Sequence, residues 1–331
     1  MENKISGAIY GLALGDAMGM PSELWGRERV RNYFGEITEF LDGPAENEVA
    51  CHYSKGQFTY DTGQALVILD SLKETNYIPN TQHLAKRLLQ WADHENAFDK
   101  NMLGPTTKVA LTKFREGKDA KAFTDKSLSN GSAMRISPIG CLFKPSDKER
   151  LARYVYQVSR VTHTSDITIA GAAMIAMGVS SALINEDFSK VLTDIYDIEK
   201  IARSLGKETF SPSLSERTKL GVELANTYKF QDKLFLEKIY DLIGAGVNIS
   251  ESVPAAISIA YYAQDPNKSA LLCANLAGDT DTIGAMSTSI CGAFTGMNRI
   301  EKKYIDTLNK ANSVNLSQYV DDLLMARGRL Q

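Results

Sequence analysis

The sequence lacks both a long hydrophobic run and an excess of basic residues. No stretch approaches about 18 uninterrupted apolar residues, the length that spans a bilayer as a helix. The formal net charge is −3, from 37 Lys and Arg against 40 Asp and Glu, so no basic surface is expected to attract nucleic acid. The N-terminal segment is broken by Gly7, Gly11 and Gly15 and has the pattern of neither a signal peptide nor a membrane span. We therefore expect a cytoplasmic protein with no membrane or nucleic-acid partner.

The chain also has few cysteines, and they lie far apart in the sequence. Cys51, Cys141, Cys273 and Cys291 form no C-x-x-C pair, which favours reduced thiols over disulfides or zinc ligands. A linker rich in Pro, Ser or charge is absent, and nothing repeats at a fixed period. A chain of 331 residues is long enough for one large domain or two small ones, and we predict a single domain over residues 1–331.

What the sequence does contain is helical periodicity, which predicts an all-α fold. Residues 21–60 have turn residues and little periodicity, so we predict a long loop with short ordered pieces there. Only Ile136 to Phe143 has weak strand character, and Pro138 argues against a central strand. Apolar residues recur at helical spacing in 5–18, 62–72, 83–91, 109–114, 148–161, 167–183, 216–228, 234–242, 253–262, 268–276 and 283–296.

Oxygen-bearing side chains are concentrated near the end of the chain, in Gly278-Asp-Thr-Asp-Thr-Ile. Asp279, Asp281 and Thr282 directly precede a run of small and apolar residues that predicts a buried helix. Such oxygens could converge on one hard cation, Mg²⁺, Mn²⁺ or Ca²⁺. The alternative is that Asp and Thr cap an ordinary helix N-terminus.

A second cluster also consists of oxygen-bearing side chains just before a predicted helix. Thr59 and Asp61 lie just before the helix predicted from residue 62, again as short oxygen side chains at a helix start. Capping is again the alternative, with Asp61 near the positive end of the helix dipole. Helix N-termini repel cations, so the carboxylates of a shared metal site must outweigh the two dipoles.

Three further stretches carry groups suited to a binding site. The loop Asn130-Gly-Ser-Ala-Met134 exposes backbone N–H groups and allows close approach of phosphate or ribose oxygens, unless it is only a turn. Arg135 follows it and suits either a phosphate or a structural carboxylate. His163 precedes an Ala-rich helix and is either a structural hydrogen-bonding group or a titrating one. Glu23 follows a glycine-rich segment and is either solvated or a general base near a cation.

Together these stretches resemble the ADP-ribosylglycohydrolase family. The resemblance spans roughly residues 5–300 and includes the helix start Ser252-Val-Pro-Ala-Ala256. Several motifs in the same order are far harder to meet by chance than one. They are G-D-A-M-G-M-P-S-E at 15–23, T-Y-D-T at 59–62, N-G-S-A-M-R at 130–135, T-H at 162–163 and G-D-T-D-T-I-G-A-M at 278–286.

The resemblance implies an all-α fold with a binuclear Mg²⁺ or Mn²⁺ site in a cleft. The implied reaction is hydrolysis of the N- or O-glycosidic bond to the distal ribose of ADP-ribose, attached to a protein side chain or a small ribosyl compound. Glu23 matches the acidic residue near the scissile bond, and His163 matches a residue lining the ADP-ribose site. The phosphate and ribose loop is matched by Asn130, Gly131, Ser132, Ala133 and Met134; the metal ligands are matched by Thr59, Asp61, Asp279, Asp281 and Thr282, of which the three aspartates join Glu23 as catalytic candidates.

One position departs from the family pattern. Relatives usually have T-D-D-T where this chain has Thr59-Tyr60-Asp61-Thr62, so Tyr60 takes the place of a metal-binding aspartate. A phenol loses its proton only near pH ~10 and is a poor substitute for a carboxylate, which puts a second metal in doubt. Three hypotheses follow: a glycohydrolase working with the remaining ligands, a disabled ADP-ribose-binding protein, or a glycosidase reshaped for another nucleoside-like substrate that Tyr60 contacts.

Overall fold

The computed structural model describes residues 1–330 and confirms the all-α fold. Within that range the β-type pairing consists of three isolated bridges. Short 3₁₀ turns lie at Met20–Ser22, Asn130–Ser132 and Met297–Arg299, and a π turn at Ile239–Ile243. The helices are α1 (Glu2–Gly19), α2 (Arg27–Phe34), α3 (Tyr60–Glu74), α4 (Thr81–His94), α5 (Pro105–Arg115), α6 (Lys121–Thr124), α7 (Ser137–Gly140), α8 (Lys148–Ser159), α9 (Asp166–Ala182), α10 (Phe188–Arg203), α11 (Leu214–Thr227), α12 (Asp232–Lys238), α13 (Ile249–Ala263), α14 (Pro266–Ala274), α15 (Thr280–Thr295), α16 (Lys302–Ala311) and α17 (Leu316–Leu330).

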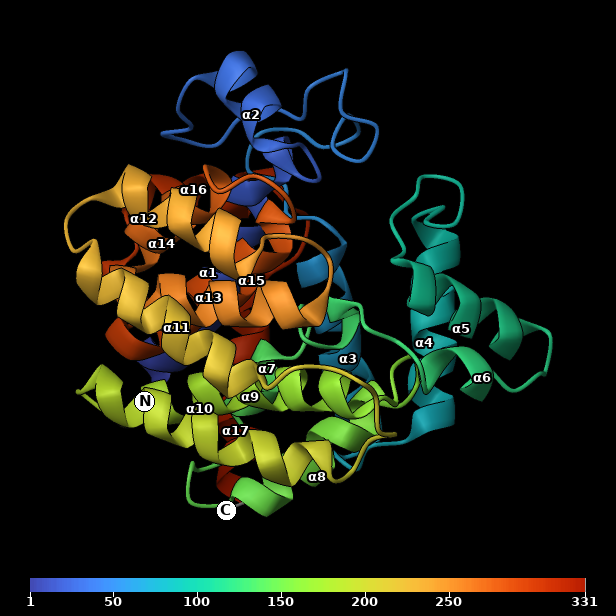
Figure 1. Cartoon of the computed structure of the whole chain (residues 1–331). Coiled ribbons are helices and arrows are strands. Elements are labelled where there is room, and N and C mark those ends of the chain that lie inside the picture. Colours follow the sequence, from blue (N-terminus) through green and yellow to red (C-terminus); the bar gives the residue numbers. More distant parts are fainter. Residues whose placement is uncertain (331) are drawn as a thin grey trace.

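Helices α1 and α15 form a tightly packed antiparallel pair in the interior (Figure 1). Glycines recur every four residues on α1, and a Cβ on Gly15 would lie 2.0 Å from the carbonyl oxygen of Gly284. Close backbone contact of this kind needs small residues on both helices. Because a Cβ on Gly19 would lie 2.3 Å from the Thr280 carbonyl oxygen, the end of α1 meets the start of α15. The two polar motifs at these helix ends are therefore neighbours.

The structure corrects the sequence analysis at several elements. Residues 136–143 form no strand: Ser137–Gly140 is the short helix α7, and Pro138 sits in its first turn, where a missing N–H costs nothing. Helix α2 is the ordered piece within the predicted loop at 21–60. The periodicity analysis missed α10, α16 and α17. The N-cap of α10 is Asp187, whose side chain accepts a hydrogen bond from the backbone N–H of Ser189.

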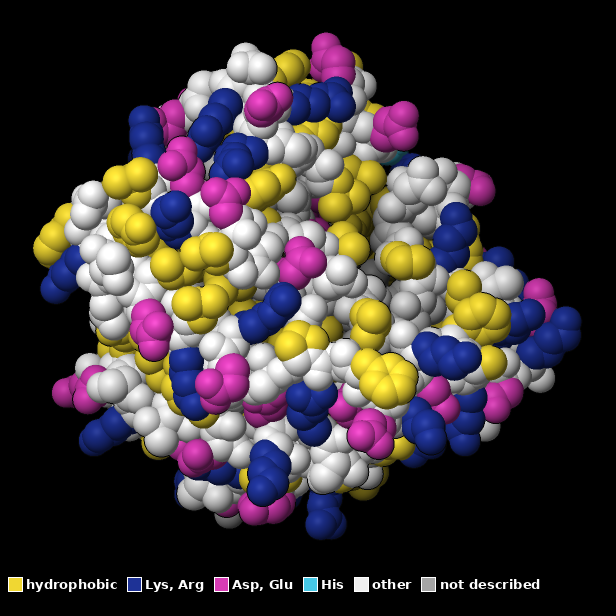
Figure 2. All heavy atoms as spheres, in the orientation of Figure 1, with side chains coloured by type: hydrophobic (Ala, Val, Ile, Leu, Met, Phe, Trp, Pro, Cys, Tyr) yellow, Lys and Arg dark blue, Asp and Glu magenta, His cyan; other side chains and the backbone are white. Residues whose placement is uncertain are grey.

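Two groups of segments extend from the main helical body. Helix α2 and its loops cover one end, and α4, α5 and α6 stand together to one side (Figure 1). Figure 2 shows that the surface is hollowed between the main body and the α4–α6 group. None of the described helices is long and apolar enough to cross a bilayer. The four cysteines are unpaired, as predicted, and three of them are buried.

Candidate functional site

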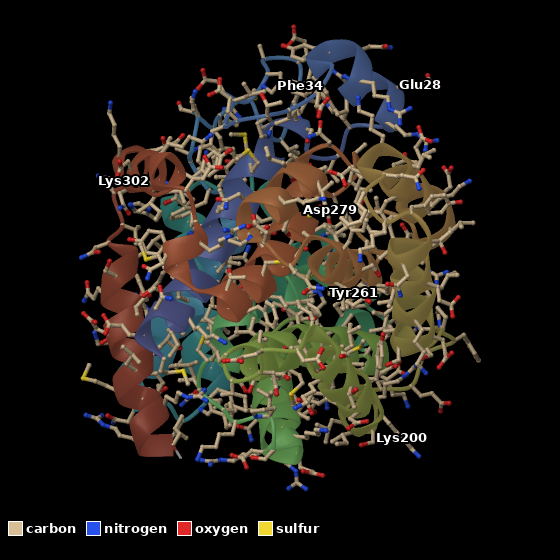
Figure 3. The ribbon with its side chains drawn as sticks, turned by 90° about the vertical axis from the view of Figure 1, so that its left-hand side faces the viewer. Glu28, Phe34, Lys200, Tyr261, Asp279 and Lys302 are labelled. Carbon is tan, nitrogen blue, oxygen red and sulfur yellow. The ribbon has the colours of Figure 1, made fainter. Side chains whose placement is uncertain are left out.

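Four acidic side chains from three helix ends meet in the interior. Asp61 lies in the first turn of α3, Asp279 and Asp281 lie at the start of α15, and Glu23 follows the 3₁₀ turn after α1. One carboxylate oxygen each from Glu23, Asp279 and Asp281 lies within 4.8 Å of the others. All four side chains are buried. Figure 3 shows Asp279 inside the molecule, below the segment that carries Glu28 and Phe34.

Backbone hydrogen bonds hold the Glu23 segment against the start of α15. The N–H of Leu24 donates to the carbonyl of Gly278 at 2.7 Å, and the N–H of Gly278 donates to the carbonyl of Trp25 at 2.9 Å. Gly278 has φ +82°, and a Cβ there would lie 2.2 Å from the carbonyl oxygen of Ala245. Only glycine fits this turn, which explains the glycine of the G-D-T-D-T motif.

Several oxygens of this acidic cluster have no partner within the protein. Both carboxylate oxygens of Asp61, Oε2 of Glu23 and Oδ1 of Asp281 are buried without a hydrogen bond. Unpaired buried carboxylates are costly, because burial removes their hydration and nothing replaces it. A hard divalent cation would supply the missing partner, and oxygen-only ligands are the set that Mg²⁺ or Mn²⁺ prefers. The residues present therefore fit a metal ion.

The threonines expected as ligands line the same cluster. The hydroxyl of Thr59 donates to Oδ2 of Asp281 at 3.3 Å. Thr282 is buried, and its side chain lowers the pKa of Asp61 and of Asp279, against the larger effect of burial. The five residues predicted as metal ligands are thus brought together from α3 and α15.

Burial and mutual repulsion disfavour the charged forms of these acids. Burial raises the pKa of Glu23 to about 8 and that of Asp279 to about 6. Burial and neighbouring carboxylates raise the pKa values of Asp61 and Asp281 well above the ordinary range. Among the described residues no lysine or arginine forms a salt bridge with any of the four carboxylates, and the charge of the buried Arg135 acts on Asp61 alone of the four. A bound cation would therefore supply positive charge that the other three carboxylates lack.

The capping alternative is wrong for Asp279. Asp279 occupies the N-cap position of α15, yet its side chain caps no backbone N–H. Its Oδ2 instead accepts a hydrogen bond from Nδ2 of Asn130 at 2.5 Å, and the same amide donates to the hydroxyl of Ser252 at 3.1 Å. Capping holds at the other cluster, where the Thr59 hydroxyl accepts from the N–H of Asp61 at 3.4 Å. Asn130 thereby ties the predicted phosphate and ribose loop to the acidic cluster.

Tyr60, the departure from the family pattern, contacts the predicted base. Its hydroxyl donates to Oε1 of Glu23 at 2.6 Å. Burial and the nearby carboxylate of Glu23 raise the pKa of Tyr60 well above its usual value, so the phenol keeps its proton. Glu23 is fully buried rather than solvated, with Oε1 held by Tyr60 and Oε2 free. A neutral Tyr60 hydroxyl therefore holds Oε1 of Glu23 in place.

The sequence analysis missed Asp16, which supports the cluster from α1. Its Oδ1 accepts from the N–H of Thr59 at 2.8 Å, and its Oδ2 accepts from the N–H and the hydroxyl of Thr62 at 2.9 and 2.6 Å. These bonds hold the start of α3 against α1. The signal was an aspartate inside an otherwise apolar, glycine-rich helix, a position at which a buried acid needs partners.

The predicted phosphate and ribose loop is buried and closely packed. Ser132, Ala133 and Met134 are buried, and the Ser132 hydroxyl donates to the carbonyl of Thr168 at 2.9 Å. A Cβ on Gly131 would lie 2.9 Å from Cε1 of His163, so the imidazole lies directly on this glycine. His163 therefore lies beside the loop.

Hydrogen bonds fix the imidazole of His163 on both sides. Nε2 lies 3.1 Å from the Ser129 hydroxyl and Nδ1 lies 2.7 Å from the Thr162 hydroxyl. Burial, with a smaller effect of the Arg135 charge, lowers the pKa of His163 well below its usual value, so the ring is neutral. Arg135 is itself buried and donates to Thr162 at 2.5 Å and to the Gln64 side chain. The guanidinium is thus committed to side-chain partners inside the protein.

Known proteins match this chain over almost its whole length. The chain is 42% identical over 325 residues to an uncharacterized protein, YegU, of Escherichia coli (strain K12), covering 98% of this chain and 97% of that one. It is 26% identical to the ADP-ribosylhydrolase ARH3 of Homo sapiens, covering 91% and 88%. It is 25% identical to the ADP-ribosylarginine hydrolase Tri1 of Pseudomonas putida (strain GB-1), covering 92% and 74%.

A solved structure and a family model agree with these matches. The structure, titled an ADP-ribosylglycohydrolase-related protein complex, superposes with a TM-score of 0.70 at 21% identity and covers 99% of this chain and 98% of its own. At that identity it shows the fold. A sequence model of the ADP-ribosylglycohydrolase family matches residues 1–331. The chain therefore belongs to the ADP-ribosylglycohydrolase family.

Proposed function

We propose that this protein is a metal-dependent hydrolase that cleaves the glycosidic bond to the distal ribose of ADP-ribose, on a modified protein side chain or a related small ribosyl compound. One observation carries the proposal: buried carboxylates with unpartnered oxygens lie beside the Asn130 loop, joined to it by the Asn130–Asp279 hydrogen bond. A purely structural acidic cluster would have its oxygens satisfied. We expect the protein to act in the cytoplasm.

We assign cation binding to residues at the starts of α3 and α15, and nucleotide binding to the Asn130 loop. Mg²⁺ or Mn²⁺ would be held by Thr59, Asp61, Asp279, Asp281 and Thr282, and when bound it supplies Lewis-acid stabilisation of developing negative charge. Asn130, Gly131 and the neighbouring backbone of the loop hold the nucleotide part of the substrate, with His163 supporting the loop as a neutral ring.

Glu23 is the proposed general base. Its Oε1 is fixed by the Tyr60 hydroxyl, which leaves Oε2 as the atom that accepts a proton from the attacking water. Holding a base in one orientation lowers the entropy lost on reaching the transition state. The oxygen of this water bonds to the ribose anomeric carbon as the bond from that carbon to the leaving atom breaks. The proton taken up by Glu23 is balanced by one delivered to the leaving atom, and the products are ADP-ribose and the freed side chain.

Release of ADP-ribose from arginine-, serine- and acetyl-linked substrates, with Mg²⁺ or Mn²⁺ present, tests this proposal. Turnover should depend on the cation and should be lost in Asp279→Ala. Asp187→Ala, which removes an exposed cap on α10, is the matched control and should retain activity. If the whole panel, together with simple nucleosides, stays intact at high enzyme concentration, the protein is not a hydrolase of this class.

The Tyr60–Glu23 hydrogen bond also supports a second candidate, an ADP-ribose-binding protein with impaired catalysis. A phenol in place of a carboxylate removes one negative charge from the cation site and occupies one oxygen of the base. Calorimetry with ADP-ribose separates the candidates, because micromolar binding without turnover supports the binding protein and turnover rejects it. If Tyr60→Asp changes which substrate is cleaved rather than how fast, the site is instead adapted to another nucleoside-like compound.

A further inference from the structure

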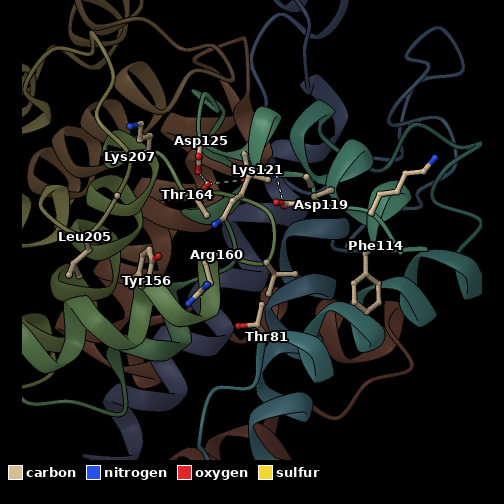
Figure 4. Close-up of a pocket in the computed structure, with 16 residues that line it drawn as sticks. Thr81, Phe114, Asp119, Lys121, Asp125, Tyr156, Arg160, Thr164, Leu205 and Lys207 are labelled. Carbon is tan, nitrogen blue, oxygen red and sulfur yellow. Dashed lines mark hydrogen bonds between the residues drawn. The ribbon is translucent and has the colours of Figure 1, made fainter. Parts of the chain in front are cut away.

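A cavity of about 490 Å³ lies next to the segment that carries His163 (Figure 4). It is bounded by α5, α6, α8 and residues 205–207 after α10. Thr164, which follows His163, lines the cavity, and none of its lining residues belongs to the acidic cluster or to the Asn130 loop. Small-molecule sites typically measure about 300–1,000 Å³. The cavity is therefore large enough for a ligand and separate from the candidate active site.

Three basic side chains on the lining of this cavity have no acidic partner. Within residues 1–330, the charged groups of Lys121, Arg160 and Lys207 form neither an ion pair nor a hydrogen bond. The guanidinium of Arg160 lies 5.4 Å from the centre of the Tyr156 ring, which leaves its N–H groups free. In Figure 4 the side chains of Lys121 and Arg160 extend toward the same space beside Tyr156. The cavity thus brings together positive groups that the protein itself does not neutralise.

The two carboxylates on the lining are engaged in holding the cavity wall. Oδ1 of Asp125 accepts a hydrogen bond from the Thr164 hydroxyl at 2.6 Å, and Oδ1 of Asp119 accepts one from the backbone N–H of Lys121 at 2.9 Å. Neither carboxylate forms a salt bridge with a described residue. The lining therefore holds more positive than negative charge, although the net charge of the whole chain is −3. A concave surface with such a surplus attracts anions.

Backbone hydrogen bonds fix the wall from which Lys207 extends. The N–H of Lys207 donates to the carbonyl of Thr164 at 2.8 Å, and the N–H of Thr164 donates to the carbonyl of Thr124 at 3.1 Å. A wall that is already ordered lowers the entropy lost when a ligand binds. Phosphate oxygens suit this lining, because a guanidinium and ammonium groups bind phosphate through charge-assisted hydrogen bonds. A singly charged anion would neutralise only one of the three cations, so the lining favours an anion with several charges.

We propose that the cavity between α5, α6 and α8 is a second binding site, which takes a multiply charged, phosphate-bearing anion through Lys121, Arg160 and Lys207. The oxygens of the anion replace the water that solvates these three exposed side chains in the free protein. The site does not depend on the proposed function, because it shares no residue with the proposed metal ligands, with Glu23 or with the Asn130 loop. It can therefore be tested on metal-free protein without any turnover.

The first test is calorimetry with inorganic pyrophosphate, at low ionic strength, on protein freed of metal by dialysis. We expect saturable binding that weakens about ten-fold in Lys121→Ala and in Arg160→Ala, and no saturable binding of acetate. Both side chains are exposed and unpaired, so urea unfolding of the variants should match that of the wild type. Lys118→Ala is the matched control: Lys118 also lines the cavity, but its ammonium lies 3.0 Å from the Glu116 carboxylate, so the affinity should stay within about two-fold.

The second test locates the bound anion, because the Asn130 loop is also expected to bind phosphate. In an NMR titration, pyrophosphate in the cavity should shift the backbone amide of Gly206, which lines it, and the shift should be lost in Arg160→Ala. A shift confined to the amide of Gly131 would place the anion at the Asn130 loop and overturn the proposal. The absence of saturable pyrophosphate binding, or an affinity that is the same in the wild type, Lys121→Ala and Arg160→Ala, would also overturn it. Failure to release ADP-ribose from any substrate would count against the proposed function alone.

Discussion

Asp16 and Asp61 are both aspartates that are completely buried, and they differ in what surrounds them. Asp16 accepts three hydrogen bonds from Thr59 and Thr62, whereas neither oxygen of Asp61 has a partner. A satisfied buried carboxylate holds structure together, while an unsatisfied one costs stability until a ligand arrives. Asp16 thus belongs to the structural support of the site, and Asp61 to the part that would bind a ligand. Substitutions at the two kinds of position test this distinction.

The largest effect is expected from Asp281→Asn, which keeps the shape of the side chain and removes its charge. Metal stabilisation of a transition state contributes several kcal/mol, so activity should fall on the order of 10³-fold, or about 4 kcal/mol. The metal-free protein should be no less stable than the wild type, because a costly buried charge is gone. Initial rates and urea unfolding in EDTA measure the two quantities. If Asp281→Asn is clearly less stable than the wild type, Asp281 has a structural role like that of Asp16.

Asp16→Ala should give the opposite pattern. Removing the acceptor leaves two backbone N–H groups and one hydroxyl unsatisfied in the interior, which should lower the free energy of unfolding by about 3 kcal/mol. Urea unfolding without cation is the measurement, with Asp61→Ala as the control, since that change removes a side chain without hydrogen-bonding partners. Equal losses of stability in the two variants would show that the contrast between the two aspartates has no energetic meaning.

The sequence predicted the site residues that stand next to one another in a motif, and it missed the one whose partners lie far away along the chain. The pairs Thr59 with Asp61 and Asp279 with Asp281 were predicted because oxygen side chains at helix starts are visible in the sequence. Asp16 was missed because its partners are 43 and 46 residues away, and only the packing of α1 against the start of α3 brings them together. Apolar residues at helical spacing predicted most helices, whereas α7 was taken for a weak strand because its apolar run is too short for its periodicity to distinguish a helix from a strand.

A smaller effect is expected when the stability of the protein is measured as a function of pH and of added cation. Burial raises the pKa values of Asp279 to about 6 and Glu23 to about 8, so the folded protein binds protons that the unfolded chain has released. The penalty is absent below the unfolded pKa values near ~4 and grows as pH rises through the folded ones, so metal-free stability should fall between pH 5 and pH 8.

Saturating Mg²⁺ or Mn²⁺ should restore stability at pH 8 and do little at pH 5, because protons compete with the cation for the same oxygens. Thermal unfolding in EDTA and in metal at the two pH values measures this. Asp281→Asn in the same buffers is the control and should show a weaker metal effect. A stability that rises with pH in EDTA would mean that the carboxylates are stabilised by groups of the protein, as Asp16 is.

The smallest effect is expected for substitutions at Tyr60, whose hydroxyl orients the proposed general base. Tyr60→Phe removes the hydrogen bond to Oε1 of Glu23 and frees the base to rotate, so kcat should fall about ten-fold with KM nearly unchanged. Tyr60→Asp adds a fifth carboxylate, which should tighten Mn²⁺ binding and weaken metal-free stability. Calorimetry with Mn²⁺ and steady-state rates measure both. Faster turnover in Tyr60→Asp would show that the tyrosine limits an otherwise ordinary family site. If Tyr60→Asp binds Mn²⁺ more tightly but turns over more slowly, catalysis depends more on the orientation of Glu23 than on a second cation. Tyr60 would then serve the reaction itself rather than the stability of the fold.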